Sequence, residues 1–163
     1  MPAQAVSRDN LGAWLLKAHP DVWDIRRFRA AGEDTIRSWS VQPGYRSRLM
    51  RPGDRALFWL SGPGTGGLVR GVWGLGHVRA EPEPWSDTDS GWWLDPSARR
   101  GVRARVEVDI ALLDDPVPAA ELRAAGIDDL EVLRVPQMSN PSWVSRAQLA
   151  ALDAVLPDWP ELA

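Results

Sequence analysis

Residues 102–112 read VRARVEVDIAL and contain the most regular alternation of apolar and polar side chains in the sequence. Apolar residues occupy every second position from 102 to 112, and two arginines and two acids occupy positions 103, 105, 107 and 109 between them. Successive side chains of a β-strand point to opposite faces of the sheet. The pattern therefore predicts a strand with one buried face and one solvated face.

Apolar segments that precede this strand predict further strands. Residues 13–17 form a short apolar run that ends before His19-Pro20, where proline disfavours helical backbone. Residues 55–60 and 68–79 are rich in Leu, Val and Trp and flank the glycine-rich stretch 61–67, which predicts a hairpin. Glycines at positions 71, 74 and 76 inside the second of these strands indicate bulges or bends, as a closing barrel needs.

Short helices are predicted between and after the strands. Ser145 and Gln148 have the spacing of a capping box before a final helix with an apolar stripe. The other helical patterns lie at residues 21–31, 43–50, 118–125 and 128–133. We therefore predict one α+β domain over residues 1–163, in which about five or six strands form a small mixed β-barrel with helices packed around it.

Composition excludes several classes of site. The 163 residues suffice for one domain with its own core. Cysteine is absent and the two histidines lie 58 positions apart, which argues against disulfides, zinc ribbons, thiol catalysis and a histidine-rich metal centre. We expect no metal and no cofactor. The sequence has no apolar run of about 18 residues and no leader pattern at its start, so we expect a cytoplasmic protein that does not enter a membrane.

No catalytic motif is recognisable in the sequence. Gly62, Gly64 and Gly67 match the spacing of a dinucleotide-binding loop, but an apolar strand follows them where that loop requires a helix. A phosphate-binding lysine motif and a nucleophile elbow are missing. We therefore expect a protein that is not an enzyme.

Charge is unevenly distributed along the chain, whose net charge is -3. Residues 1–60 contain ten basic and six acidic side chains, whereas residues 106–163 contain three basic and eleven acidic ones. This distribution allows a polyanion to bind the first two-thirds of the chain and not the last third, and a solvated surface with segregated charges is the alternative.

Tryptophan is the dominant aromatic residue, with ten copies against two Phe and one Tyr. The cations are almost all arginine, which is typical of a high-GC gene, and such a gene also favours Trp. Trp14, Trp59 and Trp73 lie in predicted strands and are expected in the core. Trp39 adjoins a turn, and the polar segment 81–101 contains Trp92 and Trp93, so these three are candidates for a binding surface.

A series of short motifs resembles the EVE domain family over roughly residues 12–156. Each motif alone is short, but their order and spacing match the family's. They are AWLLKAHP at 13–20, WSV at 39–41, the arginine-bearing segment 45–50, PGD at 52–54, ALFW at 56–59, GVWGLGHV at 71–78 and PQMSNP at 136–141.

The resemblance implies both a fold and a function. EVE domains belong to the PUA-like superfamily, whose fold is a small β-barrel, and their near relatives are YTH domains. Both are implied to hold a flipped-out modified base in an aromatic pocket, in DNA for EVE domains and as methylated adenine in RNA for YTH domains. A base offers two π faces and a polar edge, which aromatic walls and a few polar groups can bind. We therefore expect a non-catalytic module that recognises a modified cytosine or a related base, with DNA favoured over RNA as the partner.

The resemblance also suggests which residues form the pocket. Trp39 and Ser40 resemble the first cage tryptophan and its neighbouring serine, with Val41 in the third place of that motif. Either Trp92 or Trp93 takes the place of the second cage tryptophan. The polar residues expected around the base are Lys17, His19, Ser139 and Asn140, and those expected to hold flanking phosphates are Arg46, Arg48 and Arg51.

Alternatives remain open for the site and for the function. Trp39 could be a core residue, Lys17 a surface charge and His19 a cap at the end of its strand. The same fold could serve as an RNA-binding or RNA-modification accessory module. It could also be a nuclease of the ASCH type that uses Lys17 and neighbouring arginines.

Overall fold

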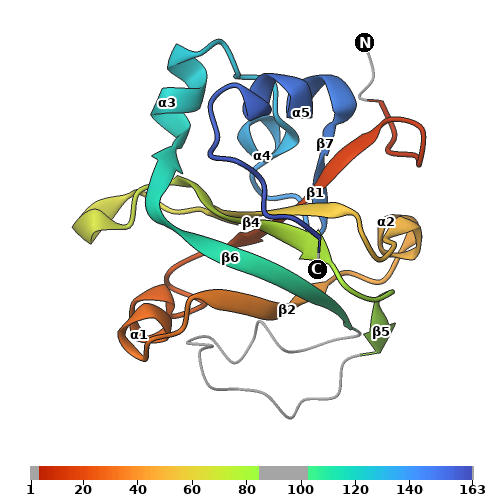
Figure 1. The fold of residues 1–163 in the computed structure, drawn as a ribbon, viewed down its shortest axis with the longest axis horizontal. Coiled ribbons are helices and arrows are strands. Elements are labelled where there is room, and N and C mark those ends of the chain that lie inside the picture. The colour runs from red at the N-terminus through yellow and green to blue at the C-terminus, as the bar shows by residue number, and fades with distance from the viewer. Residues whose placement is uncertain (1–3, 85–102, 163) are drawn as a thin grey trace.

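The computed structural model describes residues 4–84 and 103–162. Its strands form one mixed sheet, and helices pack on one face and at the ends of it (Figure 1). The α+β class predicted from the sequence is thus confirmed. The strands are β1 (Leu11–Ala18), β2 (Thr35–Val41), β3 (Arg55–Leu60), β4 (Gly71–Val78), β5 (Glu83–Pro84), β6 (Ala104–Pro118) and β7 (Ser142–Ser145). The helices are α1 (Ile25–Ala30), α2 (Tyr45–Leu49), α3 (Ala119–Ala124), α4 (Glu131–Arg134) and α5 (Arg146–Asp153), with a 3₁₀ turn at Thr65–Gly67.

The strand order is β2-β6-β4-β3-β1-β7, and the short β5 pairs with β6. Strands β1 and β3 are parallel, and all other described pairs are antiparallel. Residues 104–112 of the predicted alternating segment lie in β6, which runs on to Pro118. Residues 104–111 of β6 pair with β2, and residues 108–118 pair with β4.

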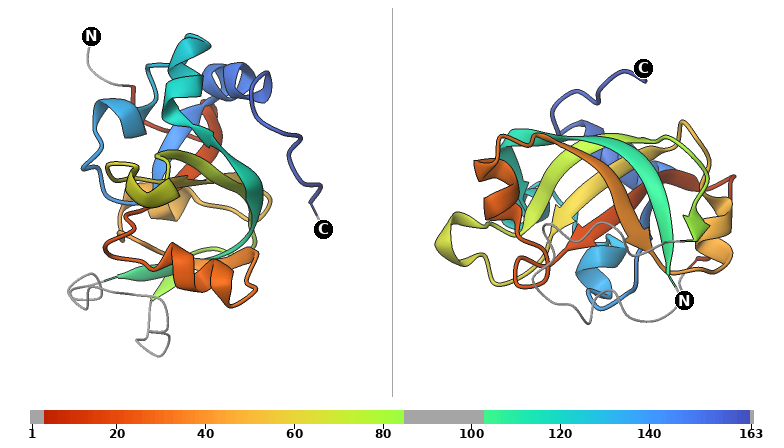
Figure 2. Two further views of the ribbon diagram at one scale, coloured as in Figure 1. Left: turned by 90° about the vertical axis from the view of Figure 1, so that its left-hand side faces the viewer. Right: turned by 90° about the horizontal axis from the view of Figure 1, so that it is seen from below.

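The prediction of a closed barrel is wrong, because the sheet is open between β2 and β7. The sheet curls strongly (Figure 2), and its two end strands come close at one point, where the Gln42 amide donates to the Asn140 carbonyl at 2.7 Å. The next residue, Pro141, has no N–H to donate, so the pairing cannot continue there. Among the described strands, β2 therefore pairs only with β6 and β7 only with β1.

The glycines of β4 permit close approach to β6, and the predicted irregularities are confirmed. A Cβ atom at Gly76 would lie 1.7 Å from the Asp109 carbonyl oxygen, which no side chain could tolerate. The register shifts between Val72 and Gly74 and again between Phe58 and Trp59 on β3. These shifts bend the two strands and contribute to the curl of the sheet.

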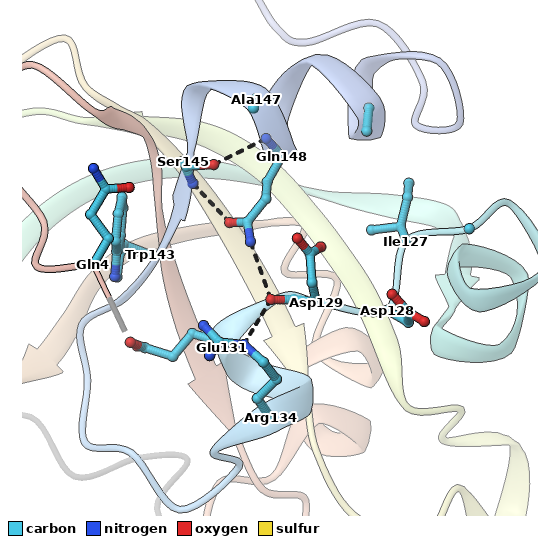
Figure 3. A pocket seen from close by; sticks show the side chains of 12 residues that line it. Gln4, Ile127, Asp128, Asp129, Glu131, Arg134, Trp143, Ser145, Ala147 and Gln148 are labelled. Carbon is cyan, nitrogen blue, oxygen red and sulfur yellow. Dashed lines mark hydrogen bonds between the residues drawn. The ribbon is translucent and has the colours of Figure 1, made fainter. Parts of the chain in front are cut away.

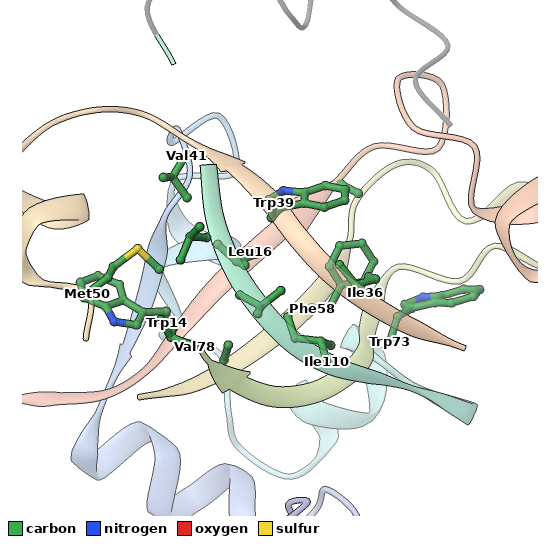
Figure 4. Packing of buried hydrophobic residues seen from close by; sticks show 14 of the residues in the cluster. Trp14, Leu16, Ile36, Trp39, Val41, Met50, Phe58, Trp73, Val78 and Ile110 are labelled. Carbon is green, nitrogen blue, oxygen red and sulfur yellow. The ribbon is translucent and has the colours of Figure 1, made fainter. Parts of the chain in front are cut away.

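Two clusters of buried side chains pack on opposite faces of the sheet. The inner cluster fills the concave face and includes Trp14, Leu16, Trp39, Phe58 and Trp73 (Figure 4). Helices α3, α4 and α5 cover the other face of the sheet (Figure 1). The outer cluster includes Leu15, Leu57, Trp59, Leu122 and Leu152. Because β1 and β3 are buried on both faces, their sequences are continuous apolar runs and do not alternate. Trp14, Trp59 and Trp73 are buried, as predicted.

Asp54, the last residue of the PGD turn, connects this turn to other parts of the fold. Its carboxylate accepts hydrogen bonds from the Trp14 indole at 2.9 Å, the Arg51 amide at 2.9 Å and two Arg8 guanidinium nitrogens at 2.7 and 2.8 Å. The turn before β3 is therefore attached to β1 and to the N-terminal segment.

Helix α5 begins at the predicted capping box. The Gln148 amide donates to Ser145 Oγ at 3.1 Å, and the Ser145 amide donates to Gln148 Oε1 at 2.9 Å. Within the described part of the chain, no helix combines the length and apolar character needed to cross a bilayer.

Candidate nucleic-acid interface

Trp39 lies on β2 within a group of aromatic side chains. Its ring is 5.0 Å from Trp23 and 5.0 Å from Phe58, with an interplanar angle of 79° in both pairs. Edge-to-face contacts of this kind fix the plane of an aromatic ring. Trp39 is only 4% exposed, so in this structure its ring is a core residue of the inner cluster.

Trp23 was not recognised from the sequence, although it is a central member of this aromatic group. It is 4.9 Å from Phe28, and Asp24 between them caps α1 by accepting from the Arg27 amide at 3.0 Å. An apolar residue before an N-cap that packs on the fourth helical residue is a hydrophobic staple. The spacing of Trp23, Asp24 and Phe28 could have indicated this staple from the sequence. The contact of Trp23 with Trp39 is long-range and could not be inferred in this way.

His19 lies in the turn that carries Trp23. Its carbonyl accepts from the Trp23 amide at 2.9 Å, and its Nδ1 accepts from the Asp21 amide at 3.1 Å. The His19 side chain is 41% exposed, and its Nδ1 lies 3.8 Å from Asp21 Oδ2.

Lys17 and Asn140 are in direct contact. The Lys17 amide donates to Asn140 Oδ1 at 2.9 Å, and Asn140 Nδ2 donates to the Lys17 carbonyl at 3.0 Å. The Asn140 carbonyl accepts from Gln42, one residue after β2. Asn140 thus joins the end of β1 to the end of β2, and its amide group is engaged in this role.

The Lys17 ammonium lies beside the segment that leads to β7. It donates to the Pro136 carbonyl. Burial lowers the pKa of Lys17, and the charge of Glu131 opposes this shift. Ser139, in the same segment, is exposed to solvent.

Ser40 and Val41 follow Trp39 on β2 and have different environments. Val41 is buried in the inner cluster. Ser40 is half-buried, and its Oγ accepts from Arg103 Nη1 at 3.3 Å. Burial lowers the pKa of Arg103.

Trp92 and Trp93, the candidates for a second aromatic wall, lie outside the described residues.

Arg46 forms an internal ion pair and does not point freely into solvent. Its two terminal nitrogens donate to Glu131 Oε1 and Oε2 at 2.7 and 2.9 Å. The Ser142 hydroxyl donates to Glu131 Oε1 at 2.8 Å. Burial favours a raised pKa for Glu131, but the hydrogen bonds from Arg46 and Ser142 outweigh it, and the pKa lies below its ordinary value. This network holds α2, α4 and β7 together.

Arg48 and Arg51 line an open groove of about 500 Å³ between α2 and the start of β6. Arg103, which contacts Ser40, lines the same groove. Arg51 Nη1 lies 3.5 Å from Glu81 Oε1, and both side chains are largely exposed. The groove therefore offers cationic groups close to the end of β2 that carries Trp39 and Ser40.

Two buried carboxylates make stability sensitive to acid. Burial works to raise the pKa of Asp54, but hydrogen bonds from Arg8 and Trp14 outweigh it and the pKa is lowered, as it is for Glu131. When the folded-state pKa is lowered, the stabilisation is complete above the unfolded pKa and is lost as the pH falls through the folded value. We expect the free energy of unfolding to fall steadily below about pH 4.5, the ordinary value for Glu.

Urea unfolding followed by tryptophan fluorescence between about pH 3 and pH 7 would measure this dependence. Glu131→Gln and Asp54→Asn should each flatten the acid limb of the profile. An acid limb as steep in both variants as in the parent protein would contradict the assignment.

The described residues contain no group of three His, Asp or Glu side chains placed to hold a metal ion. The polar groups of the candidate residues described above are an amine, an imidazole, a hydroxyl and guanidinium groups. These groups suit hydrogen bonding to a base edge and ion pairing with phosphate.

The model of the EVE domain family matches residues 12–150, which is most of the chain. The chain belongs to the EVE domain family. The resemblance inferred from the sequence motifs is thus confirmed. A comparison with functionally curated proteins gave no match.

Solved structures share the fold of this EVE domain at low sequence identity. A Pseudomonas syringae protein has a TM-score of 0.59 at 19% identity, and the alignment covers 88% of this chain and 98% of that one. A Leishmania major protein has a TM-score of 0.59 at 21% identity, with 91% and 96% covered. Human THYN1, in a crystal structure with DNA that contains 5-methylcytosine, has a TM-score of 0.51 at 16% identity, with 90% and 99% covered.

Proposed function

We propose that this EVE domain binds DNA and recognises a flipped-out modified cytosine, or a related base, that stacks on Trp39. The observation that carries the proposal is the placement of Trp39, fixed edge-to-face by Trp23 and Phe58 and followed on β2 by Ser40. Family membership supports it, as does the structure of human THYN1 with 5-methylcytosine-containing DNA. The proposal assigns the whole of residues 1–163 to one domain of this kind.

Base binding requires movement around Trp39. Only 4% of the residue is exposed, whereas a stacked base covers one whole face of an indole ring. The side chains that cover the ring must therefore shift when the base enters. Trp92 or Trp93 supplies the second wall in this proposal, as the family resemblance implies.

Polar residues near Trp39 read the edge of the base. Ser40 and His19 each offer a group that can donate or accept a hydrogen bond, and Lys17 offers a donor. Ser139 is exposed near the same place, in the segment that precedes Asn140. Asn140 shapes the site by holding the ends of β1 and β2, because its own amide is engaged with Lys17.

Flanking phosphates bind Arg48 and Arg51 in the groove beside α2. Arg46 supports this surface from within through its ion pair with Glu131. Each phosphate contact releases bound cations from the DNA. The slope of log affinity against log salt concentration is therefore proportional to the number of these contacts.

We expect Arg48→Gln and Arg51→Gln each to reduce that slope by about one and to weaken modified and unmodified DNA equally. Fluorescence anisotropy with a labelled oligonucleotide at several salt concentrations would measure both quantities. Arg123→Gln, on the exposed face of α3, is the matched control and should leave the slope unchanged. An unchanged slope in both groove variants would exclude this surface as the phosphate contact.

A binding panel tests the proposed function itself. Tryptophan fluorescence quenching would be measured with matched oligonucleotides that contain cytosine or 5-methylcytosine, as DNA and as RNA. The proposal requires saturable binding with preference for a modified base and for DNA. Stronger binding to the ribose series would favour an RNA-binding module, and cleavage of either substrate at stoichiometric protein would favour the nuclease alternative.

A further inference from the structure

Arg105 lies near the start of β6, opposite Ser40 on β2 and Glu83 on β5 in the register of the sheet. Its neighbours Ala104 and Val106 belong to the inner cluster. Successive side chains of a strand point to opposite faces of the sheet. The Arg105 side chain therefore lies on the outer face, at the end of β6 that is farther from α3, α4 and α5 (Figure 1).

The guanidinium of Arg105 makes no hydrogen bond and no ion pair with residues 4–84 and 103–162. Its Nε atom is buried and has no acceptor. Glu83 lies across from Arg105, and Glu107 follows two residues later on the same strand, but neither carboxylate is bonded to the guanidinium. A buried N–H of a charged group that lacks an acceptor costs free energy. An anion that approaches the outer face here would supply the missing acceptor.

The cationic surface beside α2 extends along β6 to Arg105. Arg103 lies two residues before Arg105 on the strand, so both side chains emerge on the same face. The groove contains three arginines and two glutamates, which are Arg48, Arg51, Arg103, Glu81 and Glu83. A guanidinium presents several N–H donors in one plane and suits the oxygens of a phosphate. Arg105 therefore adds a donor without a carboxylate partner to a surface that already contains cations.

The hollow beside α4 has a different chemical character (Figure 3). Its volume is about 520 Å³. Two of the donors that line it, Arg134 Nε and Gln148 Nε2, both donate to the Asp129 carbonyl, at 2.9 and 3.1 Å. The exposed side chains of Asp128 and Asp129 add negative charge there. A phosphate group is therefore expected at Arg105 and not in this hollow.

We propose that Arg105 binds the phosphate next to the flipped-out nucleotide, so that the DNA strand crosses the free edge of β2. This inference rests on the proposed function. Trp39 and Ser40 are consecutive residues of β2, and they lie opposite Val106 and Arg105 of β6. Among the described strands, β2 has no partner on its other side. A nucleotide whose base stacks on Trp39 at the inner face and whose phosphate accepts from Arg105 at the outer face passes over this edge.

Arg105→Met tests the contact, because methionine removes the charge and the buried N–H but keeps apolar volume. We expect binding of the 5-methylcytosine oligonucleotide to weaken about tenfold, as for the loss of one charge-assisted hydrogen bond. The slope of log affinity against log salt concentration should fall by about one. The urea midpoint should stay the same or rise, because an N–H without an acceptor is removed. Fluorescence anisotropy and urea unfolding measure these quantities.

A second measurement identifies the phosphate. Single phosphates of the 5-methylcytosine oligonucleotide are replaced in turn by uncharged methylphosphonate. For the parent protein, replacement next to the modified nucleotide should weaken binding. For Arg105→Met the same replacement should cause no further loss, whereas replacements at other contacted phosphates should still weaken binding. Arg37→Met, at an exposed arginine of β2, is the matched control and should behave as the parent does.

Three results would each overturn the assignment of Arg105. They are a further loss in Arg105→Met as large as in the parent, an equal loss of affinity in Arg37→Met, and a lowered urea midpoint of Arg105→Met, which would indicate a structural role. The same titrations compare cytosine with 5-methylcytosine in the parent protein. Lack of preference there would overturn the proposed function and this inference together, whereas a preference that Arg105→Met leaves unchanged in affinity and salt slope would overturn the inference alone.

Discussion

Replacement of Trp39 by leucine should weaken binding of a 5-methylcytosine oligonucleotide about tenfold or more. Stacking of one base on an aromatic side chain contributes roughly 1–3 kcal/mol, and about 1.4 kcal/mol corresponds to a factor of ten. Leucine retains apolar volume in the inner cluster but has no π face. Fluorescence anisotropy with modified and unmodified oligonucleotides would show the affinity of each falling to the same low level, with loss of the preference between them.

Trp73→Leu is the matched control for this substitution. Trp73 belongs to the same inner cluster and is 2% exposed, compared with 4% for Trp39. Its indole N–H donates to the Val69 carbonyl at 2.7 Å. Both substitutions remove a buried tryptophan, so both should lower the free energy of unfolding, but only Trp39→Leu should remove selectivity. Equal effects of the two variants on selectivity would show that packing, and not stacking on Trp39, controls binding.

Replacement of Glu131 by alanine should lower the free energy of unfolding by about 3–5 kcal/mol at neutral pH. The Glu131 side chain is 9% exposed and the Arg46 side chain 19%, so the pair is largely removed from water. Without the carboxylate, the Arg46 guanidinium loses both of its short ion-pair contacts, and the Ser142 hydroxyl loses its acceptor. Urea unfolding followed by circular dichroism would measure the change.

The control for Glu131→Ala is a double variant that removes both charges. Arg46→Met/Glu131→Leu should recover most of the lost stability, because apolar side chains of similar size can replace a buried ion pair at little net cost. Glu121→Ala, at an exposed position of α3, should change stability by less than about 0.5 kcal/mol. A loss below about 1 kcal/mol for Glu131→Ala would mean that water compensates the unpaired guanidinium.

The strands could be predicted from the sequence because burial imposes a simple pattern on each of them. Strand β6 has one solvated face in its first half and alternates, whereas β1 and β3 are buried on both faces and read as apolar runs. Whether the sheet closes depends on a few long-range contacts. One of these is the backbone hydrogen bond between Gln42 and Asn140, which are 98 positions apart, and the local periodicity of the sequence does not predict it.

The contacts of the candidate site residues also depend on residues far apart in the sequence. The EVE resemblance implies that Trp39, Lys17 and Asn140 belong to one pocket, and this assignment stays a prediction. The structure joins Lys17 to Asn140 directly. The role of Arg46 depends on Glu131, a residue 85 positions later that could not be paired with it from the sequence. The contact of Trp23 with Phe28 could have been predicted from the local sequence, because the two residues have the spacing of a hydrophobic staple.

The gap between β2 and β7 has a thermodynamic consequence for ligand binding. Trp39 and Ser40 lie on one side of this gap, and Lys17 and Asn140 lie on the other, with one backbone hydrogen bond between the two sides at Gln42. In the complex that we propose, a base that contacts both sides would bridge the two edges of the sheet. Its binding energy would then oppose separation of the edges, so we expect the free energy of unfolding to rise when the base binds.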